Sequence, residues 1–121
     1  MNINFTKSAI KFIDEALEKN KESLEDIALA IYTRRSIGWG GVKISTAISL
    51  IRAEMEEIQK EFQEIDKYKN GSSAELPILI DEKSRQLLSY HDTITVDAFG
   101  WGYFRKLGIR NSPVYYGSGS C

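Results

Sequence analysis

The sequence predicts one domain of mixed α and β structure, the α+β class. The chain has 121 residues, 42% of them hydrophobic, which is the size and apolar content of one compact domain. Short apolar runs alternate with glycine turns, most clearly at Gly38-Trp39-Gly40-Gly41 and Gly100-Trp101-Gly102. Runs of this length are typical of strands, whereas helical spacing of apolar residues appears near the N-terminus. We expect the domain to span residues 1–113 and residues 114–121 to form a flexible tail.

The N-terminal segment reads as a strand followed by a helix. Polar and apolar residues alternate from Asn2 to Phe5, as in a short strand. Thr6 can then accept hydrogen bonds from the first free amides of a helix that continues to about Asn20. The apolar residues of this helix fall on one stripe that would face the core: Ile10, Ile13 and Leu17.

The next segment allows two interpretations. Ser23-Leu24-Glu25-Asp26 resembles the start of a helix, but Ile27 to Tyr32 is a continuous apolar run of strand length. We expect a buried strand that ends at Thr33-Arg34-Arg35. After the first glycine turn, Val42, Ile44 and Ile48 alternate with polar residues, which predicts a returning strand and a hairpin.

Residues 50–68 predict an inserted helix. Their apolar residues are spaced alternately by four and three, the spacing of a heptad seam: Ile51, Met55, Ile58, Phe62 and Ile65. Such a helix either packs on the sheet or contacts a dimer partner or another protein. Asn70-Gly71-Ser72-Ser73 would end it.

The C-terminal half predicts further strands. Leu76 to Ile80 is an apolar strand, and Asp81 can cap a short helix that carries Leu87 and Leu88. His91 lies in the following turn, where a surface histidine is the expected interpretation and a metal or proton-transfer role the alternative. The last strands are then expected at Thr93 to Ala98 and at Tyr103 to Ile109.

Composition argues against several classes of function. Lys and Arg number 16 against 17 Asp and Glu, so the net charge gives no case for a nucleic-acid or anionic-membrane partner, although the chain after Asp97 is locally basic. No apolar run reaches the roughly 18 residues of a membrane span, and the N-terminus lacks the pattern of a secretory signal. The single cysteine, Cys121, excludes an internal disulfide, so we expect a cytoplasmic protein.

Several motifs follow one another along the chain: the first glycine turn, Ile78-Leu79-Ile80-Asp81-Glu82-Lys83-Ser84, Ile94-Thr95-Val96-Asp97, and Gly108-Ile109-Arg110-Asn111-Ser112-Pro113. In this order they resemble the HesB/IscA-like family of A-type iron–sulfur carriers, and most closely its small HesB-like branch that includes selenoproteins. The resemblance implies a mixed β-sheet domain, a homodimer, and a role in iron–sulfur cluster assembly with other assembly proteins as partners.

The resemblance also implies where iron or a cluster would be bound. In the family, a cysteine in the first glycine turn and a Cys-Gly-Cys pair near the C-terminus bind it, because thiolates are soft, charged ligands. Here the turn has no cysteine, and the pair is represented only by Ser118-Gly119-Ser120-Cys121. Cys121 is therefore the one candidate metal and cofactor ligand, and even a dimer supplies two thiols for a cluster that normally takes four protein ligands.

Three explanations of the missing cysteines stay open. The protein has kept the fold and lost cluster binding, or its native chain continues past Cys121, for example through a selenocysteine codon, or Cys121 acts alone as a thiol ligand or redox group. We favour the first. Because no nucleophile-elbow or zinc motif is present, we expect no enzyme, and the alternative function is a protein-interaction module without metal that uses the helix at 50–68.

Overall fold

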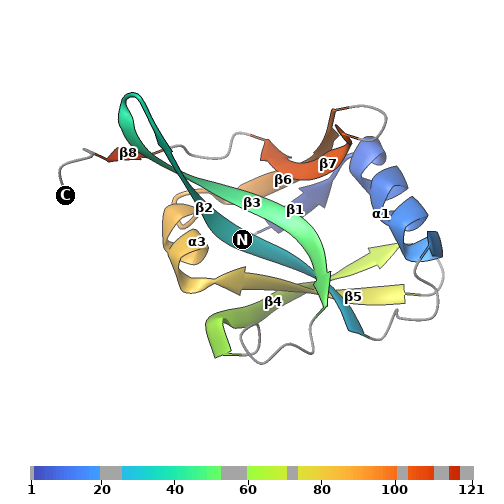
Figure 1. The fold of residues 1–121 in the computed structure, drawn as a ribbon. Helices are drawn as coiled ribbons and strands as arrows, with labels where there is room; N and C mark the ends of the chain where they lie inside the picture. Colours follow the sequence, from blue (N-terminus) through green and yellow to red (C-terminus); the bar gives the residue numbers. More distant parts are fainter. Residues whose placement is uncertain are drawn as a thin grey trace.

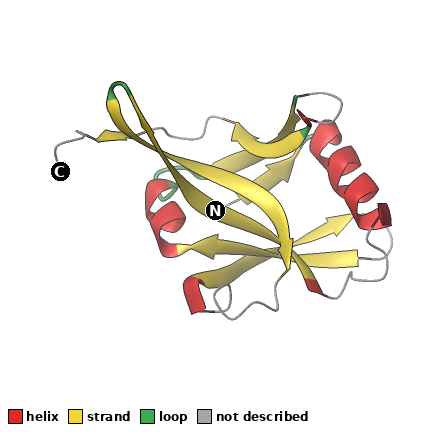
Figure 2. Cartoon of the chain, viewed as in Figure 1, coloured by secondary structure: helices red, strands yellow, loops and turns green. Residues whose placement is uncertain are grey.

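The structure is a computed structural model, and it describes residues 2–19, 26–52, 60–70, 74–100, 104–110 and 115–117. Strands predominate, with one longer and one shorter helix (Figures 1 and 2). In chain order the elements are β1 (Asn2–Phe5), α1 (Lys7–Lys19), β2 (Ile27–Gly38), β3 (Gly41–Arg52), β4 (Phe62–Asn70), β5 (Ala74–Asp81), α3 (Glu82–Leu87), β6 (Thr93–Phe99), β7 (Lys106–Arg110) and β8 (Tyr115–Gly117). The α+β class predicted from the sequence is confirmed.

The strands form two sheets. The smaller has the order β1-β6-β7, and the larger has the order β4-β5-β2-β3-β8. Two pairings are parallel, β1 with β6 and β2 with β5, whereas the others described are antiparallel. In each parallel pair, one strand leads directly into a helix, β1 into α1 and β5 into α3. The two helices lie at opposite sides of the molecule in the view of Figure 1.

The N-terminal unit forms as the sequence predicts. β1 is followed by Thr6, whose Oγ1 accepts a hydrogen bond from the Ala9 backbone N–H at 3.2 Å. This satisfies one of the amides that the first turn of a helix leaves unpaired. α1 then buries Ala9 and Ile13 completely, while Ile10 and Leu17 of the predicted stripe are partly buried.

β2 and β3 form the predicted hairpin, but β2 is longer than expected. It continues through Thr33 to Gly38, because every residue from Ile27 to Gly38 has a partner on β3. The paired strands therefore carry the polar residues that the sequence pattern assigned to a loop. Gly41, which begins β3 after the turn, has φ 114°, a conformation that L side chains rarely adopt.

The predicted helix at 50–68 is wrong at both of its described ends. Residues 50–52 belong to β3, and residues 62–68 belong to β4, whose partner is β5. Lys60 and Glu61 are helical, as predicted, and residues 53–59 lie outside the described residues. β4 carries Gln63, Glu64, Asp66, Lys67 and Lys69, which favour a helix or solvent over a strand. Its backbone pairing with β5 outweighs these weak local preferences, and the register shift between Glu64 and Asp66 is an irregularity of the kind common in edge strands.

The C-terminal elements agree largely with the sequence. β5, α3 and β6 occupy the predicted segments, whereas β7 begins at Lys106, after Tyr103, which lies outside the described residues. Within the segment expected to be a flexible tail, Tyr115–Gly117 forms β8 and pairs with residues 42–44 of β3. For residues 118–121 the flexible tail stays a prediction.

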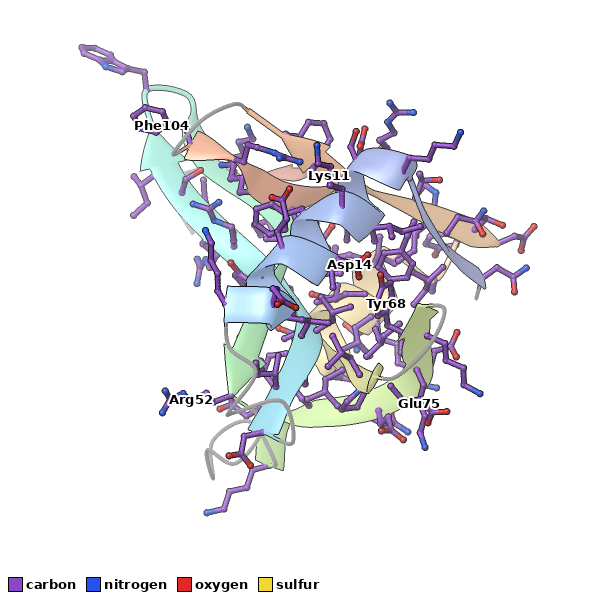
Figure 3. The ribbon with its side chains drawn as sticks, turned by 90° about the vertical axis from the view of Figure 1, so that its right-hand side faces the viewer. Lys11, Asp14, Arg52, Tyr68, Glu75 and Phe104 are labelled. Atoms are coloured by element: carbon purple, nitrogen blue, oxygen red, sulfur yellow. The ribbon has the colours of Figure 1, made fainter. Side chains whose placement is uncertain are left out.

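One hydrophobic core joins both sheets and α1. Its buried members are Ala9, Ile13, Leu29, Ile31, Ile48, Tyr68, Leu76, Ile78, Ile80, Leu88, Ile94, Val96, Leu107 and Ile109. Tyr68 of β4 lies among these side chains, near Asp14 of α1 (Figure 3), and its ring meets that of Phe5 edge-on, with centroids 4.8 Å apart. Burial of the phenol, helped by the negative charge of Asp14, raises the pKa of Tyr68 to about 12.

Candidate functional site

The one cysteine and the one histidine were the ligand candidates from the sequence. Cys121 lies outside the described residues. His91 is partly exposed in the turn after α3, where its backbone N–H donates to the Leu88 carbonyl at 3.0 Å. Within the described part of the chain, no group of three or more His, Cys, Asp or Glu side chains is arranged to hold a metal ion.

The path of the C-terminal segment is nevertheless defined as far as Gly117. β8 runs antiparallel to β3, with Tyr115 opposite Ile44 and Gly117 opposite Val42. The chain therefore travels along β3 toward the turn at Trp39 and Gly40, which Figure 1 shows at the projecting end of the hairpin. The first glycine turn and the C-terminal segment, far apart in the sequence, are thus brought to the same end of the larger sheet.

Asp81, the first acid of the motifs quoted above, has a structural role. Its Oδ1 accepts a hydrogen bond from the Ser84 backbone N–H at 2.7 Å and so caps α3, as predicted. Its Oδ2 accepts from the Thr33 backbone N–H on the neighbouring strand β2 at 3.1 Å. The hydroxyls of Thr33 and Ser84 lie 2.9 Å apart and complete the network.

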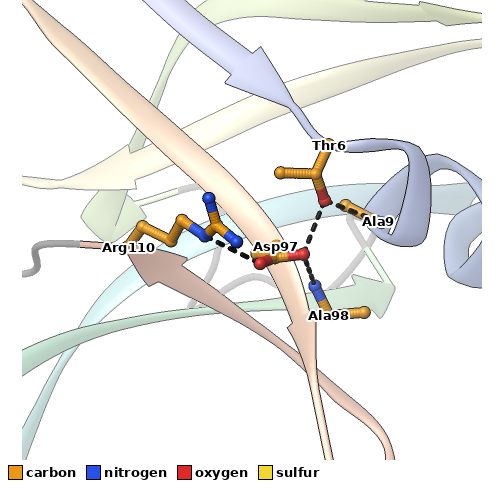
Figure 4. A network of polar contacts seen from close by, with 5 residues as sticks. All are labelled: Thr6, Ala9, Asp97, Ala98 and Arg110. Carbon is orange, nitrogen blue, oxygen red and sulfur yellow. Dashed lines mark hydrogen bonds and ion pairs between the residues drawn. The ribbon is translucent and has the colours of Figure 1, made fainter.

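Asp97, the acid of the Ile94-Thr95-Val96-Asp97 motif, organises the start of α1 (Figure 4). Its Oδ1 accepts hydrogen bonds from the Thr6 hydroxyl at 2.6 Å and from the Ala98 backbone N–H at 2.8 Å, and its Oδ2 lies 2.8 Å from Arg110 Nε. The hydrogen bond from Thr6 is the main cause that lowers the pKa of Asp97, with further lowering from Ala98 and Arg110 and an opposing effect of burial.

The two networks occupy equivalent places. Each lies where a strand passes into a helix beside a parallel neighbour, and each pairs a threonine with an aspartate across the two strands. At α1 the threonine caps the helix and the aspartate is on the neighbouring strand, whereas at α3 these roles are exchanged. The oxygens of both acids are occupied by protein donors, so we assign them to the fold and not to a reaction.

A cleft of about 530 Å³ lies between the two sheets, and we call it the β3–β7 cleft. Residues 45–50 of β3 and 105–109 at β7 line it without a gap. Because successive side chains of a strand point to opposite faces, an unbroken run of lining residues places the cleft along the strand edges. Beyond residue 44 no described strand pairs with this edge of β3, and β7 has β6 as its one described partner.

The β3–β7 cleft combines an apolar interior with positive charge. Its large apolar side chains are Phe12, Ile48, Leu50, Phe99, Leu107 and Ile109, and its charged lining residues are Arg34, Lys43, Arg105 and Lys106. None of the described lining residues is acidic. The basic character of the sequence after Asp97 indicated Arg105 and Lys106, but the contribution of Arg34 and Lys43 depends on a hairpin strand longer than the one predicted.

The hairpin end is the second notable surface. Ile37 is 88% exposed and Trp39 is fully exposed. Among the described residues, a Cβ placed at Gly38 or Gly40 would meet no atom within 4 Å. Two large apolar side chains on a projecting turn form a small contact surface beside β8.

No protein-family model matches the chain, and no curated protein matches it. None of the helices that the structure describes is long and apolar enough to cross a membrane.

Proposed function

We propose that this protein is an accessory protein of iron–sulfur cluster assembly or trafficking, a cytoplasmic homodimer that contacts other proteins of the assembly machinery. The observation that carries the proposal is the pairing of β8 with β3, which directs the C-terminal segment toward the first glycine turn. In the family that the sequence resembles, these two regions supply the cluster ligands.

The donor set of this chain does not fit a resident cluster. A cluster normally takes four protein ligands, and the chain has one thiol. In the proposed role a cluster is therefore cargo, and any ligands beyond Cys121 come from the second subunit and from the partner that delivers or receives it.

Iron and acid-labile sulfide in protein purified without oxygen test this proposal. Iron that is present in the wild-type protein and lost in Cys121→Ser would show that Cys121 is a ligand and support cluster handling, because serine removes the soft ligand. Ser120→Ala is the matched control, since it changes the neighbouring residue and keeps the thiol. Absence of iron from all three proteins would contradict cluster handling.

The second candidate is a protein-interaction module without metal. The helix on which the sequence placed its contact surface is absent from residues 50–52 and 62–68, but exposed Ile37 and Trp39 provide another surface at the hairpin end. Copurified iron separates the two functions, because only the first predicts it.

A further inference from the structure

We propose that the β3–β7 cleft binds a small amphipathic anion, a molecule with an elongated apolar body and one carboxylate or phosphate group. This inference is independent of the role in iron–sulfur cluster assembly, since it uses neither Cys121 nor the hairpin end. Its basis is a cleft of suitable size whose walls are apolar and whose charged lining residues are all cationic among those described.

The size and shape of the cleft suit such a ligand. Its volume of about 530 Å³ lies within the range of small-molecule sites in proteins, which is roughly 300–1,000 Å³. Lys43 and Leu50 both line it and are seven residues apart on β3, which corresponds to about 24 Å of extended strand. The cleft is therefore long and follows the strand, as an elongated apolar body requires.

The apolar wall is held in place by neighbouring contacts. Phe99, which is 42% exposed, lies directly against Gly108, where an added Cβ would come within 2.7 Å of the ring carbons. Glycine at 108 thus allows the ring to cover the strand at the wall of the cleft. Phe12 of α1, which also lines the cleft, lies under the guanidinium group of Arg105, whose Cζ is 5.8 Å from the centroid of the Phe12 ring.

The charges come from both sheets. Arg34 and Lys43 are diagonal neighbours on the β2–β3 hairpin, because Arg34 lies opposite Ser45, two residues along β3 from Lys43. Arg105 and Lys106 stand at the start of β7. An acid near the cleft is Glu15, whose Oε2 is 3.9 Å from Arg105 Nη1. An ion pair of this length at a half-exposed carboxylate is weak, so the cleft keeps a net positive field that favours an anion.

Displacement of a fluorescent probe tests the assignment. The probe is 8-anilinonaphthalene-1-sulfonate, which combines aromatic rings with an anionic group, and the competitors share one chain length: decanoate, decyl phosphate and decyltrimethylammonium. We expect the two anions to displace the probe at concentrations at least tenfold below those of the cation. Whichever anion binds more tightly identifies the head group. Equal displacement by the two anions and the cation would overturn the proposal.

Charge variants locate the binding. Arg34→Gln combined with Lys43→Gln should weaken decanoate and decyl phosphate binding about tenfold. The matched control is Lys11→Gln combined with Lys83→Gln, which removes two positive charges from exposed positions outside the described lining and should change affinity less than twofold. Glu15→Gln should strengthen anion binding a few-fold, because it releases Arg105. Equal effects of the two double variants would place the anion elsewhere.

Filling the cleft with a large side chain tests the binding site without changing any charge. Ala47 lines the cleft and lies opposite Tyr32 in the hairpin. A tryptophan at position 47 would face Tyr32, and aromatic pairs across neighbouring strands are favourable. Ala47→Trp should abolish anion binding while the circular-dichroism unfolding midpoint stays close to that of the wild type. If this variant fails to fold, Ser45→Trp on the same face of β3 replaces it. Unchanged affinity in a folded tryptophan variant would refute the site.

Discussion

At the scale of single residues, Tyr68 differs from the other buried polar side chains that the structure describes. It is 3% exposed, and its hydroxyl has no hydrogen-bond partner. A buried polar group without a partner costs about 1–3 kcal/mol, so Tyr68→Phe should raise the free energy of unfolding by about 1 kcal/mol. Urea unfolding at pH 7 measures this, with Tyr90→Phe, a fully solvated tyrosine, as the control.

Tyr68 also predicts a dependence on alkaline pH. Its pKa is raised from 10.0 to about 12 in the folded protein, mainly by burial, so above pH 10 the unfolded chain loses this proton and the folded chain retains it. Ionisation of Tyr68 therefore does not change the free energy of unfolding below pH 10. Between pH 10 and about pH 12 it lowers the free energy of unfolding by about 1.4 kcal/mol per pH unit. The difference between wild type and Tyr68→Phe should therefore grow over that interval, and a constant difference would contradict it.

The contribution of Asp97 to stability changes with pH in the opposite direction. Its pKa is lowered in the folded protein, chiefly by the Thr6 hydroxyl, so its contribution is present above the ordinary pKa of 3.8 and is lost as pH falls through the folded-state value. Asp97→Asn should be less stable than the wild type at neutral pH, and this difference should shrink below pH 4. Thermal unfolding between pH 7 and 2 measures it. Asp92→Asn, the same substitution at an exposed position, is the control.

At the scale of elements, Asp81 connects α3 to β2. Asp81→Ala removes the cap of the helix and the acceptor of the Thr33 N–H, and we expect it to lower the free energy of unfolding by about 1–2 kcal/mol. Asp81→Asn keeps one of the two acceptor oxygens, so it should cost less than Asp81→Ala in the same denaturant titration. If the two variants were equally unstable, one remaining acceptor would not be enough to hold α3 and β2 together.

The elements also show how far local sequence determines this fold. β1, α1, the hairpin, β5 and β6 were predictable because each combines an apolar pattern with a cap or a glycine turn. β4 was not, because Phe62 and Ile65 continue a helical spacing and the residues between them are charged or polar. Its strand conformation depends on pairing with β5, a tertiary interaction that local pattern does not record.

The candidate sites also differ in how far the sequence could indicate them. The cap at Asp81 follows from a short local motif, whereas the partner of Asp97 is Thr6, which is 91 positions away in the sequence. The β3–β7 cleft draws residues from α1, the hairpin and β7, and the sequence indicated only its basic residues after Asp97. Contacts between residues of different elements could therefore not be predicted from the sequence, because they depend on how the elements are arranged in space.

At the scale of the whole molecule, the single core predicts that both sheets unfold together. Ile13 of α1 is completely buried in a cluster that contains residues of both sheets. Ile13→Ala should lower the free energy of unfolding by about 2–5 kcal/mol, because it leaves a cavity at this junction. Ile37→Ala is the matched control: Ile37 is 88% exposed, and its loss should change stability by less than about 0.5 kcal/mol.

Calorimetry and hydrogen exchange followed by mass spectrometry would test this cooperativity. In the wild type and in Ile13→Ala, the calorimetric enthalpy should equal the van't Hoff enthalpy, which indicates a single transition. Protection of β6 in the smaller sheet and of β5 in the larger sheet should fall by the same free energy in the variant, because α1 packs into the core that both share. A variant that lost protection in β6 alone would mean that the sheets unfold separately, and that the β3–β7 cleft can open without loss of the larger sheet.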